Sequence, residues 1–158
     1  KPDNVFLRGD ERGAPLDLKV LDFGISKMTD TNLSNATGTG QSLGTPFFMP
    51  PEQMTGARSV TPAADVYALG VVIFHCLTLA YPYEAESMAE LAIKQHTEEP
   101  RSILSLRPEL GLEFDAVLRT ALARKPQDRF ATVDALVSAF APFGLGASDF
   151  NTLSSSAI

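Results

Sequence analysis

The sequence has 158 residues, of which 44% are hydrophobic and 20% are charged, and its formal net charge is -6. This composition predicts one soluble globular domain that is large enough to bury its own core. The acidic balance, without a cluster of lysines and arginines, argues against a nucleic-acid-binding surface. The single cysteine, Cys76, excludes a disulfide within the chain, and its place in an apolar run predicts a buried, inert thiol that suits a reducing cytosol.

The longest apolar stretch, residues 66–74, is too short to span a bilayer and is interrupted by His75. It predicts a buried core helix instead. No signal peptide is visible, and the sequence begins at Lys1 without a methionine. We therefore expect a cytoplasmic domain, with any targeting segment or membrane anchor of the protein lying outside this sequence.

The first part of the sequence predicts a β-hairpin. Two short β-prone runs, Val5-Phe6-Leu7 and Leu18-Lys19-Val20-Leu21, flank residues 8–17, where glycines and a proline predict a long loop. Residues 25–41 are rich in Ser, Thr, Asn and Gly and lack helical periodicity. They predict a long surface loop, and a loop of that length is usually functional or mobile.

The next part of the sequence carries start signals for two helices. Thr61-Pro62 offers an N-cap followed by proline at the first helical position, ahead of the apolar residues 66–79. Ser87-Met88-Ala89-Glu90 is a capping-box pattern, in which serine and glutamate satisfy otherwise free backbone donors at a helix start. The helix that begins there is predicted to end at about His96.

Two further amphipathic helices follow from apolar spacing at i, i+3, i+4 and i+7. The first set consists of Phe114, Val117, Leu118, Ala121 and Leu122, and the second of Val133, Leu136, Val137 and Phe140. After Phe143, residues 144–158 are rich in Gly, Ser and Ala and predict a flexible linker. The predicted fold class is therefore α+β, mostly helical with one small hairpin.

Two polar motifs flank the predicted hairpin. Lys1-Pro2-Asp3-Asn4 precedes the first strand, and Asp22-Phe23-Gly24 follows the second. Taken singly, each is explained as well by a turn. Taken together, they place Asn4 and Asp22 at the same edge of the sheet, and an amide oxygen beside a carboxylate is a hard oxygen site of the kind that Mg²⁺ prefers, with substrate phosphates as further ligands.

At this point the sequence resembles the C-terminal lobe of a serine/threonine protein kinase, most similar to bacterial members of that family. Lys1-Pro2-Asp3-Asn4 resembles the second half of the catalytic loop, and Asp22-Phe23-Gly24 the metal-binding motif. The other three resembling segments are Gly44 to Glu52, which ends the activation loop, Asp65 to Gly70, which starts the central helix, and Asp128-Arg129-Phe130 before the last helix. The resemblance runs from residue 1 to about residue 140, and it predicts a partial kinase domain over residues 1–143.

The resemblance implies roles in ATP and Mg²⁺ binding for four residues. Lys1 would steady the transferring γ-phosphate, and Asn4 would hold one Mg²⁺. Asp22 would hold Mg²⁺ that bridges the β- and γ-phosphates. Phe6 would lie beneath the adenine as an apolar floor, although an ordinary core phenylalanine explains it as well.

The resemblance implies supporting roles for four others. Thr45 would hydrogen-bond to the catalytic aspartate and to Lys1, where the alternative is a simple Thr-Pro turn. Glu52 and Arg129 would form a buried ion pair with an architectural role. Asp65 would anchor the backbone of the catalytic loop, or it is only a favourable charge at the positive end of a helix dipole.

Hydroxyl specificity and regulation are also implied. Lys1 in its motif and Gly44-Thr45-Pro46 both resemble kinases that act on Ser/Thr residues of protein substrates, rather than tyrosine kinases. Thr37 and Thr39 resemble autophosphorylated threonines, where a phosphate would order the loop by pairing with arginine. Pro50 replaces the usual alanine before Pro51-Glu52, which stiffens the backbone beside the peptide-binding region.

Several family features are absent from the sequence: the glycine-rich phosphate loop, the strand lysine and the His-Arg-Asp motif. The resemblance places the catalytic aspartate two positions before Lys1, and the N-terminal lobe would be a partner supplied elsewhere in the parent protein. We therefore expect this chain alone to be inactive. The alternative is a pseudokinase, an interaction module that keeps the fold without the chemistry, and a self-standing helical domain unrelated to kinases would require five coincidental motifs.

Overall fold

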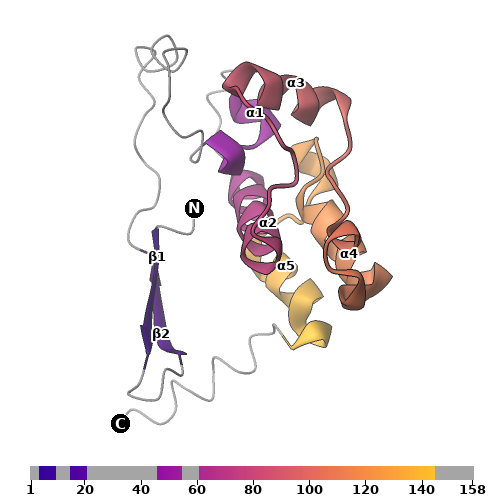
Figure 1. Cartoon of the computed structure of the whole chain (residues 1–158). Helices are drawn as coiled ribbons and strands as arrows, with labels where there is room; N and C mark the ends of the chain where they lie inside the picture. The colour runs from indigo at the N-terminus through magenta and orange to yellow at the C-terminus, as the bar shows by residue number, and fades with distance from the viewer. Residues whose placement is uncertain (1–3, 10–14, 21–45, 55–60, 145–158) are drawn as a thin grey trace. The chain divides into compact units, whose positions relative to one another are not determined.

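The structure is a computed structural model of the chain, and it describes residues 4–9, 15–20, 46–54 and 61–144 (Figure 1). The chain divides into two compact units, Lys1–Ser42 and Leu43–Ile158, which are considered separately below. The described residues are mostly helical with one two-stranded sheet, which confirms the predicted fold class. The loop predicted over residues 25–41 and the linker after Gly144 lie outside the described residues.

The first unit holds the predicted hairpin. Strand β1 (Val5–Gly9) pairs antiparallel with β2 (Pro15–Val20), from Val5 opposite Val20 to Gly9 opposite Pro15, with an irregular step after Arg8. The prediction that residues 8–17 form the loop was wrong, because both strands extend into that range. Both strands are sheet edges, so Gly9 at the end of one and Pro15 at the start of the other interrupt no interior pairing.

The second unit contains the helices. It begins with the 3-10 turn η2 (Pro46–Phe48) and the short helix α1 (Pro51–Met54), followed by the long helix α2 (Pro62–Thr78) and by α3 (Met88–Thr97). The remaining elements are η3 (Ile103–Ser105), η4 (Pro108–Leu110), α4 (Gly111–Ala121), η5 (Pro126–Asp128), α5 (Val133–Phe140) and η6 (Ala141–Phe143). Within this unit α2 contacts η2, α4, α5 and η5, while α1 contacts α3 (Figure 1).

Helix α2 begins as the sequence predicts. Thr61 has extended backbone angles, and Pro62, whose missing N–H would have no partner in the first turn, is the first helical residue. The helix ends at Leu79, which adopts a left-handed conformation with φ of 58° and donates its backbone N–H to the carbonyl of His75. A left-handed residue at this place is a common helix stop, although glycine usually fills it.

The predicted start of α3 is also confirmed, and the structure adds a cap at the start of the predicted α5. The Ser87 hydroxyl accepts a hydrogen bond from the backbone N–H of Glu90 at 3.1 Å. The Glu90 carboxylate accepts from the backbone N–H of Glu86, one residue earlier than in the usual capping box. At α5 the Thr132 hydroxyl accepts from the backbone N–H of Ala135 at 3.1 Å, so each of the two helices has one first-turn N–H capped by a side chain.

One hydrophobic core lies between these helices. Its buried members are Phe48, Val66, Tyr67, Val71, Phe74, Ile103, Phe114, Leu118, Ala121, Leu122, Leu136 and Phe140. Helices α2 and α4 approach closely at Gly70, where an added Cβ would lie 3.1 Å from the Cβ of Ala121 and 3.2 Å from the Cδ2 of Leu122. The apolar spacing predicted from the sequence selects six of these twelve residues, whereas Val133, also predicted, is 36% exposed.

The prediction of a buried thiol at Cys76 was wrong, because its side chain is exposed. Helix α2 buries Tyr67, Val71 and Phe74 on one face. Cys76 lies nine residues after Tyr67, which is about two and a half helical turns, so its side chain projects from the opposite face. In the part of the chain that the structure describes, none of the helices has the length and apolar character needed to cross a bilayer.

Candidate active-site segments

The predicted phosphate and metal ligands belong to the hairpin unit and its flanks. Lys1, Asp22, Thr45 and the phosphorylation candidates Thr37 and Thr39 lie outside the described residues. Asn4 directly precedes β1, next to Val5, which pairs with Val20 at the end of β2. Along the sequence, Asp22 follows Val20 by two residues. The register places Asn4 beside the end of β2, and the magnesium site of Asn4 and Asp22 stays a prediction.

Phe6 is described, and its side chain is 61% exposed. It occupies β1 opposite Lys19. The role of Phe6 as an apolar floor for the adenine stays a prediction from the sequence. A large exposed aromatic side chain on a strand is available to a ligand.

Glu52 and Arg129 come from distant parts of the sequence and form the predicted ion pair. The two terminal nitrogens of Arg129 donate to the two carboxylate oxygens of Glu52, each at 2.8 Å. The other three guanidinium N–H groups donate to the backbone carbonyls of Ala123 at 2.7 Å, Ala63 at 3.0 Å and Arg124 at 3.0 Å. All five donors of the guanidinium are therefore used.

This arrangement ties three separate elements together. Glu52 lies in α1, Ala63 in the first turn of α2, and Ala123 and Arg124 in the connection that follows α4. The side chain of Arg129 is fully buried, so these contacts replace the water that would otherwise solvate its charge. Removing the Glu52 carboxylate would leave the fully buried charge of Arg129 without its anionic partner, which is strongly destabilising.

Tyr67 extends this network into the core. Its ring centroid lies 4.8 Å from the Cζ atom of Arg129, a cation–π contact. Its hydroxyl oxygen accepts a hydrogen bond at 3.1 Å from Nε2 of Gln95, a buried residue of α3. Burial raises the pKa of the Tyr67 hydroxyl far above its usual range, and the opposing effects of Arg129 and the Gln95 hydrogen bond are smaller. The hydroxyl is therefore neutral at any physiological pH.

Gln95 also reaches the segment before α1. The same Nε2 atom donates to the backbone carbonyl of Met49 at 3.0 Å. Sequence reasoning did not find Gln95 as a site residue, although a signal was present. It lies four residues after the buried Leu91 on the same face of α3, and a polar residue on the buried face of a helix indicates a specific partner.

A stack of aromatic rings holds the start of the same segment. Phe47 stacks on Tyr81 with ring centroids 4.1 Å apart, and His75 stacks on Tyr81 with centroids 4.5 Å apart. Phe48 meets Tyr81 edge-on at 5.9 Å. These contacts, which the sequence did not predict, fix η2 against the connection that follows α2.

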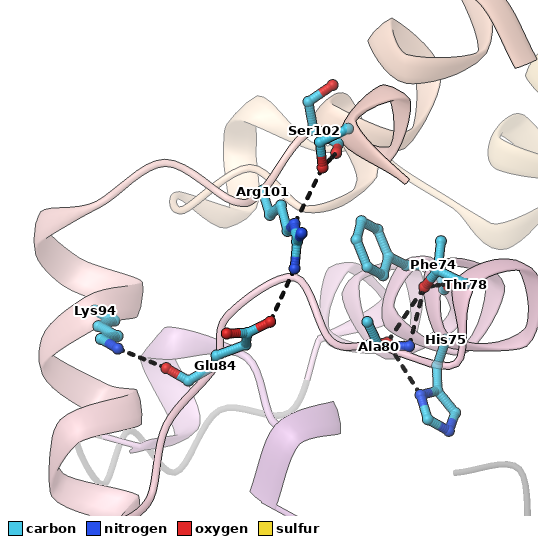
Figure 2. A network of polar contacts seen from close by, with 9 residues as sticks. Phe74, His75, Thr78, Ala80, Glu84, Lys94, Arg101 and Ser102 are labelled. Carbon is cyan, nitrogen blue, oxygen red and sulfur yellow. Dashed lines mark hydrogen bonds and ion pairs between the residues drawn. The ribbon is translucent and has the colours of Figure 1, made fainter. Parts of the chain in front are cut away.

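Polar contacts shape the connection that carries Tyr81. Figure 2 shows His75 and Thr78 gathered around the backbone of Ala80. Nδ1 of His75 lies 3.0 Å from the Ala80 carbonyl, and the Ala80 N–H donates to the Thr78 hydroxyl at 3.1 Å. The chain therefore turns sharply after α2 and presents Tyr81 to the rings of η2.

Glu84, in the connection between α2 and α3, bonds to α3 and to the segment before η3. Its backbone carbonyl accepts from Nζ of Lys94 at 2.6 Å, and its carboxylate accepts from Arg101 at 2.8 Å (Figure 2). Nearby, burial and the charge of Glu99 raise the pKa of Tyr83 to about 12. Glu84, Lys94 and Arg101 line a shallow polar depression, and in it Glu84 is bonded to both Lys94 and Arg101.

Asp65 lies exposed in the first turn of α2. That position suits a carboxylate near the positive end of the helix dipole. Its predicted contact with the catalytic-loop backbone involves residues outside the described ranges. Over residues 4–9, 15–20, 46–54 and 61–144, no cluster of three or more His, Cys, Asp or Glu side chains is arranged to hold a metal ion.

Residues 1–141 match the family model of the protein kinase domain, and the chain belongs to this family. It is 40% identical over 139 residues to serine/threonine-protein kinase Pkn1 of Myxococcus xanthus, covering 88% of this chain and 20% of Pkn1. It is 33% identical over 140 residues to serine/threonine-protein kinase PknE of Mycobacterium tuberculosis, covering 88% of this chain and 23% of PknE.

A third relative carries a different name. The chain is 38% identical over 129 residues to tyrosine-protein kinase MasK of Myxococcus xanthus, covering 80% of this chain and 19% of MasK. The chain thus spans about a fifth to a quarter of the length of these curated relatives. The predicted family, a protein kinase of the bacterial eukaryotic-like type, is confirmed.

Proposed function

We propose that the protein to which this chain belongs transfers the γ-phosphate of ATP to serine and threonine hydroxyls of other proteins. The observation that carries the proposal is the kinase-family match over residues 1–141, together with intact Lys1, Asn4 and Asp22 at their motif positions. These are the residue types that phosphoryl transfer requires, because positioning and charge neutralisation account for most of its catalysis.

The donor set of Asn4 and Asp22 fits Mg²⁺, since both offer hard oxygen ligands. When bound, Mg²⁺ would neutralise charge on the phosphates of ATP. In the proposed site Lys1 pairs with the γ-phosphate, and the exposed ring of Phe6 supports the adenine. Thr45 orients Lys1 and the catalytic aspartate that belongs to the part of the kinase domain outside this chain. The reaction would take place in the cytoplasm, where ATP is abundant.

The remaining predicted residues have supporting roles in the proposal. Asp65 anchors the catalytic-loop backbone from the start of α2. Glu52 and Arg129 hold the end of the activation segment to the helical unit through the ion pair described above. Thr37 and Thr39 are proposed autophosphorylation sites, which phosphopeptide mass spectrometry of the active protein would detect as modified residues. Finding both unmodified would remove this part of the proposal.

The first test of the proposed function is phosphate transfer by the whole protein to a generic acceptor protein, with labelled ATP and Mg²⁺. Incorporation that is abolished by EDTA is expected, whereas the 158-residue chain alone is expected to incorporate none. Robust labelling by the isolated chain would contradict the proposed dependence on an N-terminal lobe. No labelling by the whole protein would favour a pseudokinase that acts as an interaction module.

The hydroxyl class needs a separate test, because MasK is named a tyrosine-protein kinase. The lysine of Lys1-Pro2-Asp3-Asn4 and the Gly44-Thr45-Pro46 sequence support serine/threonine transfer. Acid hydrolysis of the labelled acceptor is expected to yield phosphoserine and phosphothreonine. Phosphotyrosine as the main product would contradict the proposed specificity.

A further inference from the structure

We propose that Gln95 is a positioning residue for acceptor binding, because it holds the backbone of the segment between η2 and α1 against Tyr67. The inference rests on the proposed function, and it further assigns acceptor binding to residues 46–52, which the sequence resemblance places beside the peptide-binding region. It concerns a residue of α3 that is separated from this segment by about forty residues of sequence. Gln95 acts through the segment and does not itself touch ATP or the acceptor hydroxyl.

Tyr67 is linked to both ends of the segment 49–52, through Gln95 at one end and through Arg129 at the other. At the first end, Gln95 Nε2 bridges the Met49 carbonyl, at 3.0 Å, and the Tyr67 hydroxyl, at 3.1 Å. At the second end, Glu52 is held by Arg129, whose guanidinium lies over the ring of Tyr67 at 4.8 Å. Tyr67 is 1% exposed, so this arrangement is anchored in the core of the helical unit.

The segment between these two ties offers few backbone donors of its own. Pro50 and Pro51 carry no backbone N–H, so neither can fix the segment by donating a hydrogen bond. The Pro50 carbonyl accepts from Gln53 and Met54 inside α1, at 3.0 and 3.3 Å. The amide of Gln95 is therefore the side-chain donor that fixes the backbone just before the two prolines.

Packing alone does not explain a glutamine at position 95. The side chain is fully buried, and its Oε1 atom has no hydrogen-bond partner. A buried acceptor without a partner is unfavourable, and an apolar side chain of similar size would avoid that cost. What glutamine offers here is the pair of N–H groups on Nε2, which point to two acceptors in separate elements.

Loss of this donor would free the Met49 carbonyl and allow the neighbouring η2 to shift. The other contacts of η2 are apolar: Phe47 and Phe48 meet Tyr81, and Phe48 also meets His75 and the core. Such contacts tolerate sliding more readily than a hydrogen bond does. A shift of about 1 Å in a substrate-positioning segment is enough to weaken productive binding severely. ATP is bound by other residues in the proposed site, so its binding would not change.

The main experiment compares Gln95→Met with wild type in the whole protein, using a peptide that the wild-type protein selects from a degenerate Ser/Thr library. We expect KM for this peptide to rise about tenfold, with KM for ATP and kcat within about twofold of wild type. Gln95→His, which keeps a ring N–H donor, is expected to recover most of the lost affinity. Gln127→Met, at an exposed position, is the matched control and should change none of these constants.

A second variant and a second readout separate positioning from folding. Tyr67→Phe removes one acceptor of Nε2 and keeps the ring under Arg129, so a smaller rise in peptide KM is expected. Hydrogen–deuterium exchange of residues 47–54 is expected to be faster in Gln95→Met than in wild type, with exchange in α4 and α5 unchanged. This exchange measurement does not require phosphate transfer.

The outcomes distinguish the inference from the function on which it rests. If the wild-type protein transfers phosphate and Gln95→Met leaves the peptide KM unchanged, the positioning role is wrong. The same conclusion follows if Gln95→Met raises both KM values equally and accelerates exchange throughout the helical unit, because that is a general loss of structure. If the wild-type protein transfers no phosphate, the proposed function fails. Faster exchange in Gln95→Met, confined to residues 47–54, would then still support the role of Gln95 in holding this segment in place.

Discussion

The hairpin and the helical unit differ in how much of their apolar surface is buried. The hairpin consists of two paired strands, and Phe6 on its first strand is 61% exposed. In the helical unit Phe74 of α2 is fully buried, and a continuous core joins α2, α4 and α5. A two-stranded sheet has little stability of its own in water. The comparison teaches that the proposed ATP ligands and the main source of stability lie in different parts of the chain.

The contrast yields a simple expectation. Substitutions in the helical unit should change the free energy of unfolding, whereas substitutions at the hairpin should change catalysis with little effect on stability. Binding groups are commonly carried on segments positioned by a rigid scaffold.

The largest effect on stability is expected at Arg129. Arg129→Met removes the bidentate ion pair with Glu52 and three hydrogen bonds to backbone carbonyls. We expect the free energy of unfolding of the chain, measured with urea, to fall by about 3 kcal/mol or more. Arg124→Met, at an exposed arginine, is the control. A comparable loss of stability in this control would contradict the claim that the buried contacts of Arg129 cause the effect.

A smaller loss is expected where α2 and α4 approach each other. Gly70→Ala places a Cβ at 3.1 Å from Ala121 and 3.2 Å from Leu122. Alanine favours the helix by about 1 kcal/mol over glycine, but the overpacking opposes this gain. We expect a net loss of about 1 kcal/mol in urea unfolding, partly recovered by adding Ala121→Gly. A stabilised Gly70→Ala variant would show that the two helices separate at no cost.

The helix cap of α3 should contribute less. Ser87→Ala removes the acceptor for the Glu90 backbone N–H at an exposed helix start. The expected loss in the free energy of unfolding is about 0.5 to 1 kcal/mol. Ser138→Ala, at an exposed position inside α5, should have no such cost, so equal effects of the two changes would argue against a capping role.

Part of the helical unit was predictable from the sequence. The starts of α2 and α3 followed from Thr61-Pro62 and from the Ser87 and Glu90 pair, and the presence of α4 and α5 followed from apolar spacing, because local hydrogen bonds and burial determine them. The Glu52 and Arg129 pair, separated by 77 residues, followed only from the family resemblance. Local spacing carries no information on contacts at that distance.

Other features required the structure. Cys76 belongs to an apolar run, and its exposure depends on which face of α2 meets the core. The strands extend to Gly9 and from Pro15, since turn-forming residues are tolerated at strand ends. Gln95 is polar, and its burial is explained only by the positions of Met49 and Tyr67. The proposed roles of Lys1, Asp22 and Thr45 remain predictions from the sequence.

The smallest effect on stability is expected at the hairpin. Phe6→Ser changes an exposed side chain, so the free energy of unfolding should stay within about 0.5 kcal/mol of wild type. If Phe6 supports the adenine, KM for ATP of the whole protein should rise about threefold to tenfold, because an apolar contact with the nucleotide is lost. Ile93→Ser is the matched control, since Ile93 is 63% exposed on α3 and should leave KM for ATP unchanged.

The central claim is that this chain carries the metal-binding part of a phosphotransfer site, and it is tested most directly at Asp22. The measurement is transfer of labelled γ-phosphate from ATP to an acceptor protein by the whole protein, as wild type and as Asp22→Asn. The account predicts clear incorporation by wild type and a loss of at least about a hundredfold in Asp22→Asn, because the amide cannot neutralise Mg²⁺ as the carboxylate does. Equal incorporation by the two proteins, with the same Mg²⁺ dependence, would contradict it.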